Sequence, residues 1–184
     1  MKFPSSSSAA PKNMQKLDPA QTAVRYRLLT LRDGLSSAEK KKFLKKSENS
    51  ARGLYIWGGV GRGKTMLMDE FFDSLPDGVP KRRVHYHEFM IGVHDEMHRA
   101  RQKGDAEKAL LKYAEELAKE ARVLCFDEFH VTDIADAMIL GRLFTALLDG
   151  GVICVMTSNW PPDKLYEGGL QRDRFLPFIA LLKE

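Results

Sequence analysis

Apolar residues follow two patterns in this chain, helical spacing in the first part and short buried runs later. Val24, Leu28 and Leu31 are spaced at helical intervals, which predicts a helix over residues 18–31. Residues 38–46 repeat the helical character with a strongly positive face, so we expect a second helix there. Beyond these helices, short apolar runs alternate with longer helix-forming stretches. This alternation favours an α/β fold, a parallel sheet with helices on both faces.

The same patterns place the elements of the α/β part. Short β-rich or apolar runs predict strands at residues 54–57, 84–89, 123–126 and 152–156. Helices are expected at residues 66–73, 90–122 and 134–148, with Gly104 dividing the second and Asp133 capping the third. Pro and Gly indicate a turn at residues 76–80, a helix end at 150–151 and the start of a short helix at 161–162. A chain of 184 residues is long enough for one domain with a substantial core.

The segment GGVGRGKT follows the first predicted strand and has the spacing of a phosphate-binding loop: glycine, four residues, then Gly-Lys-Thr. Its glycines permit the backbone dihedrals that point successive N–H groups at a phosphate chain. Lys64 supplies positive charge for the β and γ phosphates, and Thr65 offers a hydroxyl to Mg²⁺. The alternative is a plain glycine turn, but a chance match would rarely include the Lys-Thr pair and both flanking elements. The residues expected to bind the nucleotide are Gly58, Gly59, Val60, Gly61, Arg62, Gly63, Lys64, Thr65 and Met66.

Two carboxylates, Asp127 and Glu128, follow the apolar strand predicted at residues 123–126. Ligands of open α/β sheets bind at the carboxyl ends of the strands. Asp127 is therefore expected to serve Mg²⁺, directly or through water. Glu128 is then placed to orient and activate an attacking water. A strand that simply ends in two solvated acids is the alternative, which the preceding phosphate-loop pattern disfavours.

Polar residues also follow the last predicted strand. Asn159 is expected to reach the water near the γ phosphate. Arg172 and Arg174 lie further along, before Phe175. Such arginines either reach a neighbouring subunit's nucleotide, where they stabilise charge on the phosphoryl group, or remain solvated or ion-paired in their own subunit.

Composition excludes some classes of protein. The hydrophobic fraction of 43% and charged fraction of 29% are ordinary for a soluble globular protein, and no apolar run approaches the roughly 18 residues of a membrane span. Cys125 and Cys154 lie in apolar runs, so we expect buried core thiols in a reducing compartment. Histidines at positions 85, 87, 94 and 98 include pairs with the spacing of zinc ligands. No HExxH pattern or nearby cysteine completes a zinc site, so hydrogen-bonding histidines are the favoured interpretation.

The formal net charge of +4 is unevenly distributed. Residues 1–50 contain 11 Lys and Arg against 4 Asp and Glu, whereas residues 51–184 contain 18 against 21. We expect a disordered tail at 1–17, a basic helical segment at 18–50 and a nucleotide-binding core from 51 onward. The basic segment is either a solvated helix face or a contact for nucleic acid or an anionic membrane. The tail lacks the apolar core of a secretory signal. Its Ser-rich, acid-free composition is compatible with a mitochondrial presequence, but the absence of arginine and of an amphipathic pattern weighs against one.

Several segments together resemble one family: GLYIWGGVGRGKTMLMDEFF, VHYHEFM, VLCFDEFHVTDIADAMILGRLF and TSNWPPDKLYEGGLQRDRFLPFI. They are similar to the AAA+ ATPases of the ZapE type and to their mitochondrial relatives, the lactation-elevated or ATPase-family-gene-one-like proteins. The resemblance extends from about residue 53 to the C-terminus. It implies a P-loop NTPase core and assigns Walker A to Lys64 and Thr65, Walker B to Asp127 and Glu128, sensor 1 to Asn159, and the arginine finger to Arg172 or Arg174.

The same resemblance implies ATP hydrolysis with Mg²⁺ by an oligomeric ring that remodels or moves a protein partner. It implies a role in cell division in the bacterial cytoplasm, or in protein turnover in mitochondria, and not a secreted protein. The usual strand order of the fold is 5-1-4-3-2, and the chain is expected to stop before the fifth strand and the helical lid. An ATP-binding adaptor or loader with little turnover is the alternative function. A GTPase is disfavoured because no Asn-Lys-x-Asp segment follows Asp127.

Overall fold

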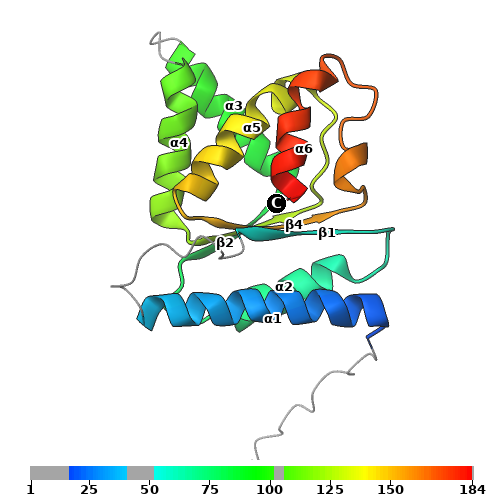
Figure 1. Ribbon diagram of the computed structural model, residues 1–184. Helices are drawn as coiled ribbons and strands as arrows, with labels where there is room; N and C mark the ends of the chain where they lie inside the picture. Colours follow the sequence, from blue (N-terminus) through cyan, green and yellow to red (C-terminus); the bar gives the residue numbers. More distant parts are fainter. Residues whose placement is uncertain (1–16, 41–51, 102–105, 184) are drawn as a thin grey trace, which may run out of the picture.

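The computed structural model describes residues 17–40, 52–101 and 106–183, which form one sheet with helices on both of its faces (Figure 1). One face is covered by α1 (Pro19–Lys40) and α2 (Lys64–Ser74). The other face is covered by α3 (Tyr86–Arg101), α4 (Ala106–Glu120), α5 (Ile134–Asp149) and α6 (Leu176–Lys183). Two short 3-10 helices precede α6 along the chain, η1 (Pro162–Lys164) and η2 (Arg172–Arg174). The predicted three-layer α/β architecture is confirmed.

The described strands all run parallel, in the spatial order β1-β4-β3-β2. Their bounds are Gly53–Trp57 for β1, Lys81–His85 for β2, Val123–Asp127 for β3 and Ile153–Ser158 for β4. This is the order expected for the first four strands of the fold, and it brings the loops after β1, β3 and β4 to one edge of the sheet. Gly53 pairs with Cys154, and a Cβ on Gly53 would lie 2.0 Å from the Cys154 carbonyl oxygen. A glycine is therefore required where β1 meets β4.

The two central strands are apolar on both faces because each face packs against helices. Phe126 and Met156 lie in the core formed with α3 to α6, whereas Cys125 and Val155 lie in the core formed with α1 and α2. Burial on both sides explains why these strands appear in the sequence as unbroken apolar runs. As predicted, Cys125 and Cys154 are buried free thiols, and burial raises the pKa of Cys125 to about 12.

One prediction about the first helices is wrong. The sequence suggested two helices separated between residues 31 and 38, but α1 is continuous. Leu28, Leu31 and Leu35 are all buried, and their spacing extends the apolar stripe beyond the predicted end. Packing of this stripe on the sheet side of α1 favours one long helix. Residues 41–46 of the predicted second helix lie outside the described residues.

The prediction for the second strand is wrong in its bounds, since β2 covers Lys81–His85 and not residues 84–89. Residues 84–89 alternate as a strand would, but β2 ends at His85 and α3 begins at Tyr86. Tyr86, Phe89 and Val93 are buried at helical spacing, which shows that the apolar positions belong to a helix face. As predicted, the following helical region is divided into α3 and α4, although Gly104 itself lies outside the described residues.

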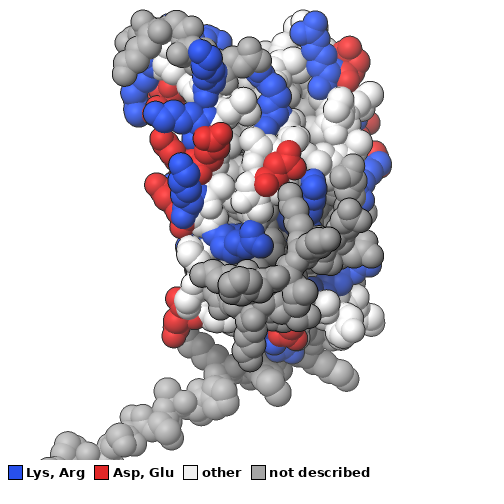
Figure 2. Space-filling view, turned by 60° about the vertical axis from the view of Figure 1, so that its left-hand side comes forward, with Lys and Arg blue, Asp and Glu red and all other residues white. Residues whose placement is uncertain are grey.

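The basic N-terminal part is only partly described. The tail expected at residues 1–17 lies outside the described residues except for Leu17, as do residues 41–50 of the basic segment. On the face shown in Figure 2, the Lys and Arg side chains that are described are interspersed with Asp and Glu side chains. Within the described part of the chain, no helix is both long and apolar enough to cross a membrane.

We predict that Phe144→Ala lowers the free energy of unfolding by about 3–5 kcal/mol, because the ring is 1% exposed and its removal leaves a cavity. Its ring contacts Phe126, Phe129 and Phe178, with centroids 5.3, 6.0 and 5.4 Å away. Urea denaturation measures the loss. Leu170→Ala is the control, since Leu170 is 70% exposed and should change the same quantity by less than about 0.5 kcal/mol. Equal losses in the two variants would contradict the assigned core.

Candidate nucleotide-binding site

The loop between β1 and α2 has the backbone geometry that its glycines permit. Gly61 and Gly63 adopt left-handed φ angles of 73° and 71°. Gly63 caps α2 without a side-chain hydrogen bond, so the first N–H groups of this helix receive no acceptor from the cap. The start of the loop is anchored because Gly58 N donates to Ser158 O at 3.2 Å. A helix N-terminus behind such a loop is suited to bind a phosphate.

Lys64 connects this loop to the end of β4. Its ammonium donates to the carbonyl oxygens of Gly58 and Gly59, both at 2.8 Å, and to Asn159 Oδ1 at 2.9 Å. Burial lowers the pKa of Lys64, while the nearby Asp127 carboxylate acts in the opposite direction. Two residues that were predicted separately, Lys64 and Asn159, therefore meet at one point.

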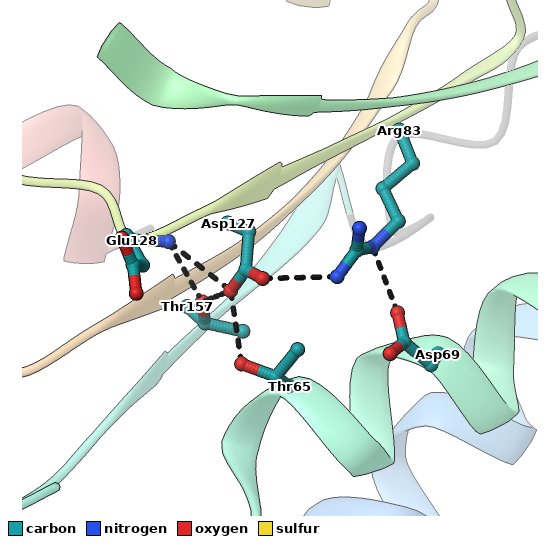
Figure 3. Close-up of polar contacts among 6 residues, drawn as sticks. All are labelled: Thr65, Asp69, Arg83, Asp127, Glu128 and Thr157. Carbon is teal, nitrogen blue, oxygen red and sulfur yellow. Dashed lines mark hydrogen bonds and ion pairs between the residues drawn. The ribbon is translucent and has the colours of Figure 1, made fainter.

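Asp127 is the centre of a polar network at the end of β3 (Figure 3). Its carboxylate is buried, with the residue 4% exposed. Oδ1 accepts hydrogen bonds from the Thr65 hydroxyl at 3.0 Å and from the Thr157 hydroxyl at 2.5 Å. Oδ2 accepts from Arg83 Nη2 at 2.9 Å. Each carboxylate oxygen thus has a donor, as a buried charge requires.

Glu128 is held in an uncommon backbone conformation. Its φ angle of 55° is left-handed, which costs a non-glycine residue about 1–3 kcal/mol. Its N–H lies 3.1 Å from both Asp127 Oδ1 and Thr157 Oγ1, and the next N–H, of Phe129, donates to Thr157 O at 2.7 Å. These bonds hold the turn while the Glu128 side chain remains exposed. Strain of this kind is typical of functional positions.

A cavity of about 960 Å³ opens at this edge of the sheet. Its volume lies in the range of sites that hold small molecules and cofactors. The predicted residues that line it are Val60, Gly61, Lys64, Thr65, Glu128 and Asn159. Other lining residues include Tyr86, His94, Asp136 and Trp160. His94 is part of a local network there, since His94 Nε2 lies 2.6 Å from Asp136 Oδ1 and the Tyr86 hydroxyl donates to Asp136 Oδ2 at 3.1 Å.

The two candidate arginines lie away from this cavity. Neither Arg172 nor Arg174 is among its lining residues. Arg172 Nη2 donates to the Asp163 carbonyl oxygen at 2.5 Å, and the residue is half-buried. Arg174 is exposed. The structure therefore does not bring either side chain to the nucleotide site of its own chain.

Sequence reasoning missed two contributions to the site. Arg83 was placed before the predicted strand, and the contact of Thr157 with Asp127 was not anticipated. Both depend on strand pairing, because β2 and β4 are the two neighbours of β3. The one available signal was the position of Thr157, which directly follows an apolar run like the one that ends at Asp127.

Comparison with known proteins relates the chain to one family and one fold. A family model described as AFG1-like ATPase matches residues 6–184. Cell division protein ZapE from Escherichia coli (strain K12) is 53% identical over 133 residues, which cover 72% of this chain and 34% of that protein. Lactation elevated protein 1 homolog B from Danio rerio is 48% identical over 141 residues, with coverage of 72% and 28%. The chain spans about a third of the length of these curated relatives.

Among solved structures, AMPPCP-bound DnaA from Aquifex aeolicus matches with a TM-score of 0.62 and 13% sequence identity. The match covers 92% of this chain and 46% of that chain. At this identity the likeness concerns the fold alone, and it agrees with the predicted parallel sheet with helices on both faces.

We predict that part of the acid sensitivity of this protein comes from His130, whose ring stacks on Trp160 with centroids 3.8 Å apart. Burial lowers the pKa of His130 from its ordinary value of 6.5. The unfolded chain therefore binds a proton first, and stability is lost as the pH falls below 6.5 toward the lower native pKa. His130→Phe keeps an aromatic ring and should reduce this loss. Urea midpoints of both proteins between about pH 5 and pH 7 measure it; parallel pH dependence would contradict the prediction.

Proposed function

This chain belongs to the AFG1-like ATPase family, and we propose that it binds ATP with Mg²⁺ and hydrolyses it to remodel or move a protein partner. The observation that carries the proposal is the meeting of Lys64, Thr65, Asp127 and Asn159 at one edge of the sheet, through contacts of 2.9 and 3.0 Å. These residues supply an ammonium, a hydroxyl, a carboxylate and an amide, which are groups that phosphoryl transfer uses.

ATP is the proposed substrate. The cavity is continuous with the glycine loop, and the DnaA neighbour was solved with AMPPCP, an ATP analogue. The Lys64 ammonium already interacts with three oxygen atoms, so phosphate oxygens are natural acceptors for the same donor. Backbone N–H groups of the loop and of the first turn of α2 are proposed to hold the remaining phosphate oxygens.

Thr65 on α2 and Asp127 at the end of β3 fit a bound Mg²⁺. Magnesium prefers hard oxygen ligands, and Thr65 Oγ1 and Asp127 Oδ1 lie 3.0 Å apart. Because the Thr65 hydroxyl donates to Asp127, its own lone pairs remain available to a cation. When bound, Mg²⁺ supplies positive charge that stabilises the phosphate oxygens. Thr65 and Asp127 are the residues proposed to hold it, with Asp127 acting directly or through water.

Glu128 and Asn159 are proposed to act on the attacking water. The Glu128 carboxylate is exposed at the cavity and is positioned by a strained turn, so it is suited to accept the water's proton. The Asn159 amide also lines the cavity, beside Lys64, where it is suited to orient the same water. Lys64 then stabilises the charge that develops on the transferred phosphoryl group.

The arginine finger is proposed to come from a neighbouring copy in an oligomer. Arg172 is occupied by a carbonyl of its own chain, whereas Arg174 is exposed on the same short helix η2. This difference favours Arg174. The backbone at Arg174 is held in place, because Phe175 directly follows it and is fully buried. The free buried cysteines fit a reducing compartment, and we propose the bacterial cytoplasm or the mitochondrion as the place of action.

We predict that Lys64→Ala and Glu128→Gln separate binding from hydrolysis. Lys64→Ala should abolish ATP binding in calorimetry because it removes the charge that meets the phosphates. Glu128→Gln should keep ATP binding but reduce phosphate release by at least about a hundredfold, because an amide cannot accept the water's proton. Lys112→Ala, at a side chain that is 76% exposed on α4, is the control. Normal turnover by Glu128→Gln would show that Glu128 is not the base.

We predict that Arg174→Ala lowers ATP turnover by about a thousandfold without weakening ATP binding, because a guanidinium from a neighbour stabilises the transition-state charge. Arg172→Ala should have a smaller effect. Mixing Arg174→Ala with Lys64→Ala should restore part of the activity, since some interfaces then combine an intact arginine with an intact pocket. No recovery on mixing, across a range of protein concentrations, would show that Arg174 does not act between subunits.

A further inference from the structure

Arg83 lies outside the cavity and outside every segment expected to touch the nucleotide, yet it contacts the centre of the site (Figure 3). It stands on β2, beside β3 in the sheet. Its Nη2 donates to Asp127 Oδ2 at 2.9 Å, and its Nε lies 2.7 Å from Asp69 Oδ1. One planar guanidinium thus joins carboxylates from two different elements, β3 and α2.

The two contacts of Arg83 join α2 and β3, the same two elements that the Thr65–Asp127 hydrogen bond joins. Thr65 and Asp69 are four residues apart on α2, so their side chains lie one turn apart on one face of the helix. Figure 3 shows the Thr65 side chain directed toward Asp127 and the Asp69 side chain directed toward the Arg83 guanidinium. Asp69 anchors Arg83 to α2, and Arg83 anchors Asp127 to β2. This bridge therefore links α2 to β3 beside the Thr65–Asp127 contact.

Arg83 also fixes the orientation of the Asp127 carboxylate. The terminal torsion of an aspartate is broad, so a carboxylate held at only one oxygen can swing its second oxygen. Here Arg83 holds Oδ2, while the hydroxyls of Thr65 and Thr157 and the backbone N–H of Glu128 hold Oδ1. Donors on opposite sides therefore keep Oδ1 facing Thr65.

We propose that Arg83 is a positioning residue for the Mg²⁺ site, acting through the Asp127 carboxylate and the Asp69 anchor. The inference rests on the proposed function, since it concerns the cation that accompanies ATP. Residues that orient metal ligands change metal affinity without touching the metal. The geometry of the guanidinium is essential here, because a lysine ammonium is a single point charge and cannot extend two fixed arms in one plane.

The decisive variant is Arg83→Lys, which keeps the charge but loses the two-armed contact. We expect it to raise the Mg²⁺ concentration needed for half-maximal binding of AMPPCP about 10–100-fold, while binding of the analogue without Mg²⁺ stays near wild type. Calorimetric titrations of the 184-residue chain at graded Mg²⁺ measure both quantities without any turnover. Arg82→Lys is the matched control, because Arg82 neighbours Arg83 on β2 and alternate strand residues point to opposite faces.

Asp69→Ala is a second variant that leaves Arg83 in place and removes its anchor on α2. We expect it to raise the Mg²⁺ requirement in the same direction and to add little in the Arg83→Lys background, since both changes break one network. A wild-type Mg²⁺ requirement in Arg83→Lys would overturn the inference and leave the proposed function standing. A lower melting temperature with an unchanged Mg²⁺ requirement would also overturn it. Failure of the wild-type chain to bind AMPPCP at any Mg²⁺ concentration would overturn the proposed function and this inference together.

Discussion

The buried carboxylate of Asp127 is the interaction on which the rest of the site depends. A charge that is 4% exposed is costly unless it is paired and hydrogen-bonded. Its donors come from three elements besides its own, namely Thr65 on α2, Arg83 on β2 and Thr157 on β4. The folded arrangement of the sheet and α2 therefore satisfies this one charge, and a shift of α2, β2 or β4 relative to β3 removes one of its donors.

Local sequence patterns identified most of the residues that the structure brings together in the candidate site, because these residues lie in short segments with recognisable patterns. The glycine loop, Lys64 and Thr65 occupy one continuous segment, and Asp127 directly follows an apolar strand. Asn159 was also found from its place after a strand, and the structure brings it to Lys64 at 2.9 Å. Parallel strands end at the same edge, so a rule about strand ends was sufficient for these residues.

The same reasoning missed Arg83 for a physical reason. With the strand predicted at residues 84–89, Arg83 fell in the preceding connection, where an arginine is ordinarily solvated. The alternation that suggested this strand belongs to the start of α3, whose buried residues Tyr86 and Phe89 face the core. Only the pairing of β2 with β3 brings Arg83 to Asp127, and strand pairing is a property of the whole fold.

Tertiary packing also determines the length of α1 and positions this helix beside the candidate nucleotide-binding site. Its continuous apolar stripe packs against the sheet, and Arg25 forms an ion pair with Glu70 on α2. At its N-terminal end, Gln21 Nε2 donates to the Arg62 carbonyl oxygen in the glycine loop at 3.2 Å. The continuous α1 thus contacts both the glycine loop and the helix that follows it, which no local pattern in the sequence predicts.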